Sequence, residues 1–124
     1  MTGAELLETY PKAAAAIKEF YYGKMIESLQ EDNDIPEEFK DLVKAQQFDS
    51  EYVATFIDTN PRFLFDILDD NEIYINVTAF HNGLFIYSII GNKPEVGSTE
   101  TSNTRKEAEK LAIEEAFKIL NNKL

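Results

Sequence analysis

The chain has 124 residues, no cysteine and a formal net charge of −11 at pH 7. This length suits one domain with a core of its own, and the lack of cysteine excludes disulfides, thiolate nucleophiles and cysteine-ligated metals. The acidic surface opposes nucleic acid and anionic membranes, which bind proteins through lysine and arginine. Most of the excess of acidic over basic side chains lies in residues 1–70, which hold sixteen acidic and six basic residues. Residues 71–124 hold seven acidic and six basic residues.

The sequence shows no sign of a membrane or export segment. Its start, Met1-Thr-Gly-Ala-Glu, lacks the basic and apolar regions of a signal peptide. No apolar run approaches the ~20 residues that span a bilayer. We therefore expect a soluble, cytoplasmic protein without a membrane partner.

Residues 1–70 predict a series of helices. A short helical turn is expected from Glu5 to Tyr10, where Pro11 interrupts the chain or starts the next helix. Between Lys12 and Gln30, apolar residues recur at the three- and four-residue spacing of a helix. They are Ala13, Ala16, Ile17, Phe20, Tyr21, Met25 and Leu29.

Three shorter helices are expected before residue 71. Asp34 caps the first, and Asp49-Ser50 and Asn60-Pro61 begin the other two. Helices this short seldom persist alone in water, so we expect them to pack on the free face of the hairpin that follows. The oxygen-rich run at 31–34 lacks the alternating ligands and glycine of a calcium loop, so no metal is expected.

Asn82-Gly83 is the strongest local signal in the chain, because both residues tolerate the positive φ angles of a two-residue hairpin turn. Such a turn pairs Phe80 with Phe85 and Thr78 with Tyr87. Side chains alternate along a strand, so one face is predicted as core. That face carries Ile73, Ile75, Val77, Ala79, Ile86 and Ile90, and the other carries Tyr74, Asn76, Thr78, Phe80, Phe85, Tyr87 and Ile89.

The second face of this hairpin is both aromatic and polar. Two alternatives follow: the N-terminal helices cover it, or it is an exposed surface for a protein partner. The residues of this candidate protein-contact face are Tyr74, Phe80, Phe85 and Tyr87.

The chain is predicted to end in a long helix over residues 104–121, after a possible third strand at 95–101. Thr104 and Glu107 have the spacing of a capping box, and apolar residues follow at helical spacing. The predicted class is therefore α+β, with a small antiparallel sheet (hairpin 73–90) backed by this helix. We expect one domain over 1–124, made of a helical acidic part (1–70) and a sheet-and-helix part (71–124).

Few residues suggest catalysis. His81 is the single histidine and lies beside the hairpin turn, where it favours a surface position over a role as base or ligand. No glycine-rich phosphate loop or nucleophile elbow is present. We therefore expect no catalytic residues, no metal site and no cofactor, and predict that the protein is not an enzyme.

Residues 61–120 resemble the double-stranded-RNA-binding domain in their order of helix, strands and helix. The closest match is Phe85-Ile-Tyr-Ser-Ile-Ile-Gly91 followed by Thr104-Arg-Lys-Glu-Ala-Glu-Lys110. The resemblance implies that Arg105 and Lys106 contact phosphates, whereas Glu109 reverses the charge of the third basic position. His81-Asn-Gly stands where the family has a Gly-Pro-x-His motif. The whole chain is also similar to uncharacterised small acidic proteins of phages and mobile elements.

Two classes of function follow from these features. The first is a non-catalytic protein-interaction or regulatory module, of which an acidic charge-mimic inhibitor is the sharper form. The alternative is a nucleic-acid-binding domain that uses Arg105, Lys106 and Lys110, which the net charge makes the weaker hypothesis. The sequence does not identify a protein partner or an oligomeric state.

Overall fold

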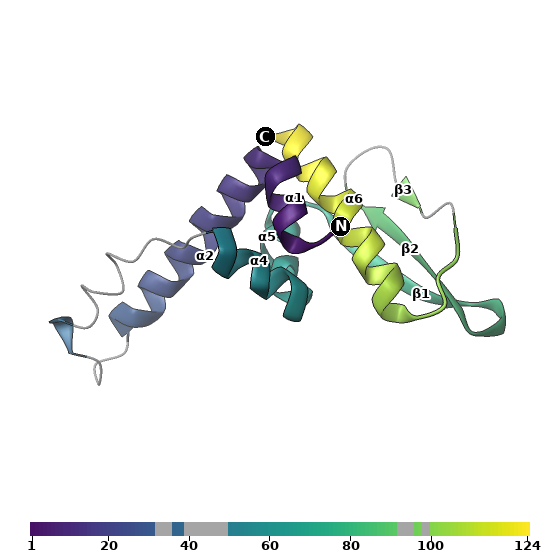
Figure 1. Ribbon diagram of the computed structural model, residues 1–124, viewed down its shortest axis with the longest axis horizontal. Coiled ribbons are helices and arrows are strands. Elements are labelled where there is room, and N and C mark those ends of the chain that lie inside the picture. The colour runs from purple at the N-terminus through teal and green to yellow at the C-terminus, as the bar shows by residue number, and fades with distance from the viewer. Residues whose placement is uncertain (32–35, 39–49, 92–95, 98–99) are drawn as a thin grey trace.

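The computed structural model describes residues 1–31, 36–38, 50–91, 96–97 and 100–124 (Figure 1). The predicted α+β class, with an antiparallel sheet and a long C-terminal helix, is confirmed. The elements in chain order are α1 (Gly3–Thr9), α2 (Pro11–Glu31), α4 (Ser50–Thr59), the 3-10 helix η1 (Pro61–Leu64), α5 (Phe65–Asp70), β1 (Tyr74–Phe80), the 3-10 turn η2 (His81–Gly83), β2 (Leu84–Ile90), β3 (Val96–Gly97) and α6 (Arg105–Lys123). The helix expected from Asp34 lies mostly outside the described residues. None of the helices described here is both long and apolar enough to cross a membrane.

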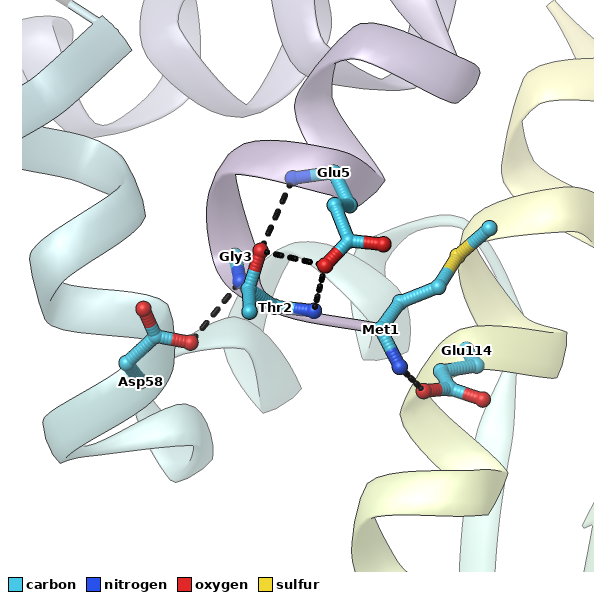
Figure 2. Close-up of polar contacts among 6 residues, drawn as sticks. All are labelled: Met1, Thr2, Gly3, Glu5, Asp58 and Glu114. Atoms are coloured by element: carbon cyan, nitrogen blue, oxygen red, sulfur yellow. Dashed lines mark hydrogen bonds and ion pairs between the residues drawn. The ribbon is translucent and has the colours of Figure 1, made fainter.

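Helix α1 begins with a capping box that the sequence analysis did not identify. The Thr2 hydroxyl accepts a hydrogen bond from the Glu5 amide at 3.2 Å, and the Glu5 carboxylate accepts one from the Thr2 amide at 3.3 Å (Figure 2). These bonds to Thr2 lower the pKa of Glu5. The Gly3 amide donates to Asp58 at 2.8 Å, which ties the start of α1 to α4.

Helix α6 packs on both the sheet and the N-terminal part of the chain. One side of it covers the β1–β2 hairpin, and α2 packs elsewhere along its length (Figure 1). Three fully buried alanines at four-residue spacing, Ala108, Ala112 and Ala116, allow this close approach. Of the N-terminal helices, α2 packs on α6, and the others pack mainly on one another. The expectation that they cover the free face of the hairpin is wrong, because Tyr74, Phe80 and Ile90 are exposed there.

The hairpin turn contains three residues instead of the two that we expected. His81, Asn82 and Gly83 form it, with φ angles of 61° at Asn82 and 74° at Gly83. Strand β1 therefore pairs Phe80 with Leu84 and Thr78 with Ile86, one residue away from the predicted register. Because side chains alternate along a strand, this shift moves every side chain of β2 to the opposite face.

The new register divides the predicted aromatic face between the two sides of the sheet. Phe85 and Tyr87 lie opposite Ala79 and Val77 on the side that packs against α6. Burial raises the pKa of Tyr87, and the nearby α6 carboxylates Glu115 and Glu114 raise it further. Tyr74 and Phe80 remain on the outer side, so the four aromatic residues do not form one surface.

The structure also shows how far the predictions hold for the third strand and for the start of α6. Strand β3 (Val96–Gly97) lies within the possible strand at 95–101, of which residues 95, 98 and 99 are outside the described residues. Ser102 forms a separate bridge to Phe85. At the start of α6 the Thr104 hydroxyl accepts from the Glu107 amide at 3.1 Å. The Glu107 carboxylate reaches back to the Asn103 amide at 3.3 Å, one residue before the cap.

We expect Gly83→Val to lower the free energy of unfolding by about 1–2 kcal/mol, because a β-branched residue resists positive φ. The space around Gly83 is open, so backbone strain alone carries the effect. Gly83→Asn is the matched control, since asparagine tolerates this conformation. Its free energy of unfolding should fall by less than that of the valine variant. Urea unfolding measures both variants, and equal stability of the valine variant and the wild type would contradict the turn geometry.

We expect Tyr21→Phe to raise the free energy of unfolding by about 1 kcal/mol, because it removes a buried polar group. The Tyr21 hydroxyl has no hydrogen-bond partner among the described residues. Burial raises its pKa, and the charges of Asp66 and Asp70 add to this. Its ring stays in place against Phe63, with centroids 4.7 Å apart. A less stable variant in urea unfolding would show that the hydroxyl is bonded.

Candidate functional site

The outer face of the hairpin is an exposed apolar surface. The exposed fractions of Tyr74, Phe80 and Ile90 are 45%, 55% and 46%. Asn76 and Thr78 lie between these residues along β1 and are also exposed, whereas Leu84 and Ile86 are half-buried. We call Tyr74, Phe80, Leu84, Ile86 and Ile90 the outer hairpin face. Large side chains at this exposure leave an apolar surface open to solvent.

The hairpin also lacks ionisable side chains, apart from tyrosines and one histidine. Residues 73–91 contain no aspartate, glutamate, lysine or arginine, although such residues make up 28% of the chain. Each described α-helix, by contrast, carries at least one exposed carboxylate. The outer hairpin face is therefore a neutral surface on an otherwise acidic molecule.

The edge of the sheet at β1 is open along most of its length. Phe85 exchanges two backbone hydrogen bonds of 2.8 Å with Ser102, so its amide and carbonyl point away from β1. Since these groups alternate in direction along an antiparallel strand, those of Ile75, Val77 and Ala79 point outward from the opposite edge. In the described part of the chain, β1 pairs with β2 alone.

Arg105 is held against this edge of the sheet. Its Nη1 donates to the Val77 carbonyl at 3.5 Å, and its guanidinium lies 5.2 Å from the centre of the Phe85 ring. These contacts fasten the first turn of α6 to the sheet and cover one carbonyl of the open edge. The arginine that the resemblance assigned to phosphate contact is thus engaged within its own chain.

Lys106 and Lys110 lie along a cleft beside α6, which Arg105 also lines. The cleft has a volume of about 420 Å³ and runs between the first half of α6, the end of α4 and η1. Arg62 reaches into it from η1 and forms an ion pair with the buried Glu109, with Nε and Oε1 3.5 Å apart. Sequence reasoning missed this cleft, because its residues come from segments far apart in the chain.

The described residues contain no group of three or more histidine, aspartate or glutamate side chains placed to hold a metal ion. His81 is exposed in the turn. Comparisons with protein-family models, curated proteins and solved structures find no match to this chain. The candidate sites therefore rest on their geometry: the outer hairpin face with its open edge, and the cleft beside α6.

Proposed function

We propose that the chain is a non-catalytic protein-interaction module that binds its partner through the outer hairpin face. The observation that carries this proposal is the exposure of Tyr74, Phe80 and Ile90 on a hairpin without charged side chains. Aromatic side chains are enriched at the centres of protein interfaces, and charged ones are depleted there. Burial of these three side chains supplies a central contact of the kind that dominates binding energy.

The open edge of β1 supports a specific mode of binding. An extended segment of a partner can add to a sheet edge through backbone hydrogen bonds, while pockets for alternate side chains give selectivity. The outward groups of Ile75 and Ala79 are available to such a segment. Arg105 covers the Val77 carbonyl through one long contact of an exposed side chain, which an incoming strand can displace at small cost.

The distribution of charge on the surface of the chain limits the kind of partner that can bind. The partner meets a neutral, apolar surface at the hairpin and carboxylates on the surrounding helices. A partner with an uncharged strand flanked by lysine or arginine satisfies both conditions, because opposite charges around an interface speed association. A second copy of this acidic chain is disfavoured by the same argument.

Affinity capture with matched variants tests the proposal. The full chain is immobilised, exposed to an extract of its source cells, and the retained proteins are identified by mass spectrometry. The test variant combines Tyr74→Ser with Phe80→Ser on the outer hairpin face. The control combines Tyr52→Ser with Phe56→Ser, two exposed aromatic residues of α4. Thermal unfolding confirms that both variants remain folded.

We expect a protein that the wild type and the control retain and that the hairpin variant loses. Once purified, this protein should also bind the wild type directly. Its affinity for the hairpin variant should be at least about tenfold weaker. Retention that is equal for all three chains, or lost equally in both variants, would contradict the proposal. Sedimentation of the chain alone shows whether a second copy occupies the face.

A further inference from the structure

The cleft beside α6 is a second feature of the surface, separate from the outer hairpin face. Its volume of about 420 Å³ falls within the roughly 300–1,000 Å³ of small-molecule sites. Four of the chain's twelve lysines and arginines line it, together with two carboxylates. They are Arg62, Arg105, Lys106 and Lys110, with Asp58 and Glu109.

Contacts within the protein engage both carboxylates of the cleft. Asp58 accepts a hydrogen bond from the Gly3 amide at 2.8 Å (Figure 2). Glu109, which is 9% exposed, forms the ion pair with Arg62. Among the described residues, neither carboxylate forms an ion pair with Lys106 or Lys110.

Lys106 and Lys110 are the two lysines of the cleft, beside Arg105, which contacts the Val77 carbonyl. They lie four residues apart on α6, so both lie on one side of the helix, at the wall of the cleft. Among the described residues, neither lysine forms an ion pair. Four cationic side chains against two carboxylates therefore leave a local excess of positive charge in the lining of the cleft, on a molecule whose net charge is −11. Glu5 lies outside this lining but close to Lys110: after its hydrogen bonds to Thr2, the charge of Lys110 also lowers the pKa of Glu5.

The rest of the lining is largely apolar. Leu6, Ile57 and Ile113 are buried residues of the core that reach the cleft, and Pro61 is half-buried at its side. A charged wall beside an apolar one suits a molecule with an ionised group and an apolar part. An ion without an apolar part would use the lysines alone.

We propose that this cleft binds a small organic oxyanion, a phosphate or carboxylate group attached to an apolar moiety. Lys106 and Lys110 contact the anionic group, and the Pro61 and Ile113 side of the cleft contacts the apolar part. Duplex nucleic acid does not fit this description, because its many phosphates extend beyond the cleft into the field of the acidic helices. The site therefore selects for a small anion.

Amide chemical-shift titrations with phenyl phosphate, benzoate and inorganic phosphate test the proposal. We expect saturable shifts around Arg62, Lys106 and Lys110 with phenyl phosphate or benzoate, and weaker binding of inorganic phosphate. Comparing the first two probes distinguishes a phosphate site from a carboxylate site. A duplex of about 20 base pairs should not bind at physiological salt.

Three variants make the result specific to the cleft. Lys106→Gln with Lys110→Gln should weaken binding by about tenfold or more, because two charge-assisted contacts are lost. Lys12→Gln with Lys118→Gln changes the net charge equally outside the cleft and should leave affinity within about twofold. Glu109→Gln removes a negative charge from the cleft and should tighten binding. Shifts that do not saturate, or equal effects of both lysine pairs, would overturn the proposal.

Discussion

Gly91→Ala is expected to lower the free energy of unfolding by more than about 3 kcal/mol, because both backbone strain and a steric clash oppose it. Gly91 directly follows β2 and has a φ angle of 119°, which residues with a side chain rarely adopt. A Cβ atom there would lie 2.1 Å from the Glu72 carbonyl oxygen and 2.8 Å from the Tyr74 ring. The shortest contact is with the backbone of Glu72, just before β1, so a side-chain rotation cannot relieve it.

The same substitution at Gly23 is the control for this prediction. Gly23 lies within α2, and a Cβ atom there meets nothing within 4 Å. Gly23→Ala should therefore raise stability by up to about 1 kcal/mol, because alanine is the better helix former. Urea unfolding of both variants gives the comparison. A Gly91→Ala chain as stable as the wild type would contradict the approach of β2 to Glu72.

Phe117→Ala is expected to lower the free energy of unfolding by about 3–5 kcal/mol, the cost of removing a fully buried aromatic side chain. Phe117 is 1% exposed and is among the largest fully buried side chains of the core. The centroid of its ring lies 6.4 Å from that of Tyr10, the residue that connects α1 and α2. Phe117 therefore joins α6 to the N-terminal part. The substitution should therefore weaken the contact of α6 with the N-terminal helices as well as its contact with the sheet.

Leu111→Ala, on the same helix, is the matched control for Phe117→Ala. The side chain of Leu111 is 41% exposed, although leucine is an apolar residue. Its loss should change stability by less than about 1 kcal/mol, since little burial is lost. Equal effects of the two substitutions would mean that a different side of α6 faces the core.

The helices were predictable from the sequence because their signals are local. Apolar spacing over 12–30 and 104–121 and the starts at Ser50 and Pro61 correspond to α2, α6, α4 and η1. The Thr2–Glu5 box has the same kind of signal and could have been found. In each case the deciding residues lie within one or two turns of each other.

The sheet register was not predictable with the same certainty, because one turn residue decides the face of a whole strand. Asn82-Gly83 correctly marked the turn, yet His81 joins it and makes it three residues long. Both faces of β2 are apolar, with Ile86 and Ile90 on one and Phe85 and Ile89 on the other. Hydrophobic alternation therefore could not correct the register.

The cleft could not be predicted from the sequence, for a different reason. Arg62 and Glu109 are 47 positions apart, and nothing in the local pattern predicts their pairing. The neutral composition of residues 73–91, by contrast, is visible in the sequence itself. It indicates an unusual surface only once the outer position of Tyr74 and Phe80 is known.

Amide hydrogen exchange along β1 tests the open edge of the hairpin, on which the proposed interaction depends. In the chain alone, the outward amides of Ile75, Val77 and Ala79 should exchange quickly, and those of Asn76 and Thr78, which pair with β2, slowly. Addition of the captured partner should slow the outward amides selectively. Protection of all β1 amides in the chain alone, or no change at Ile75, Val77 and Ala79 in the complex, would contradict the account.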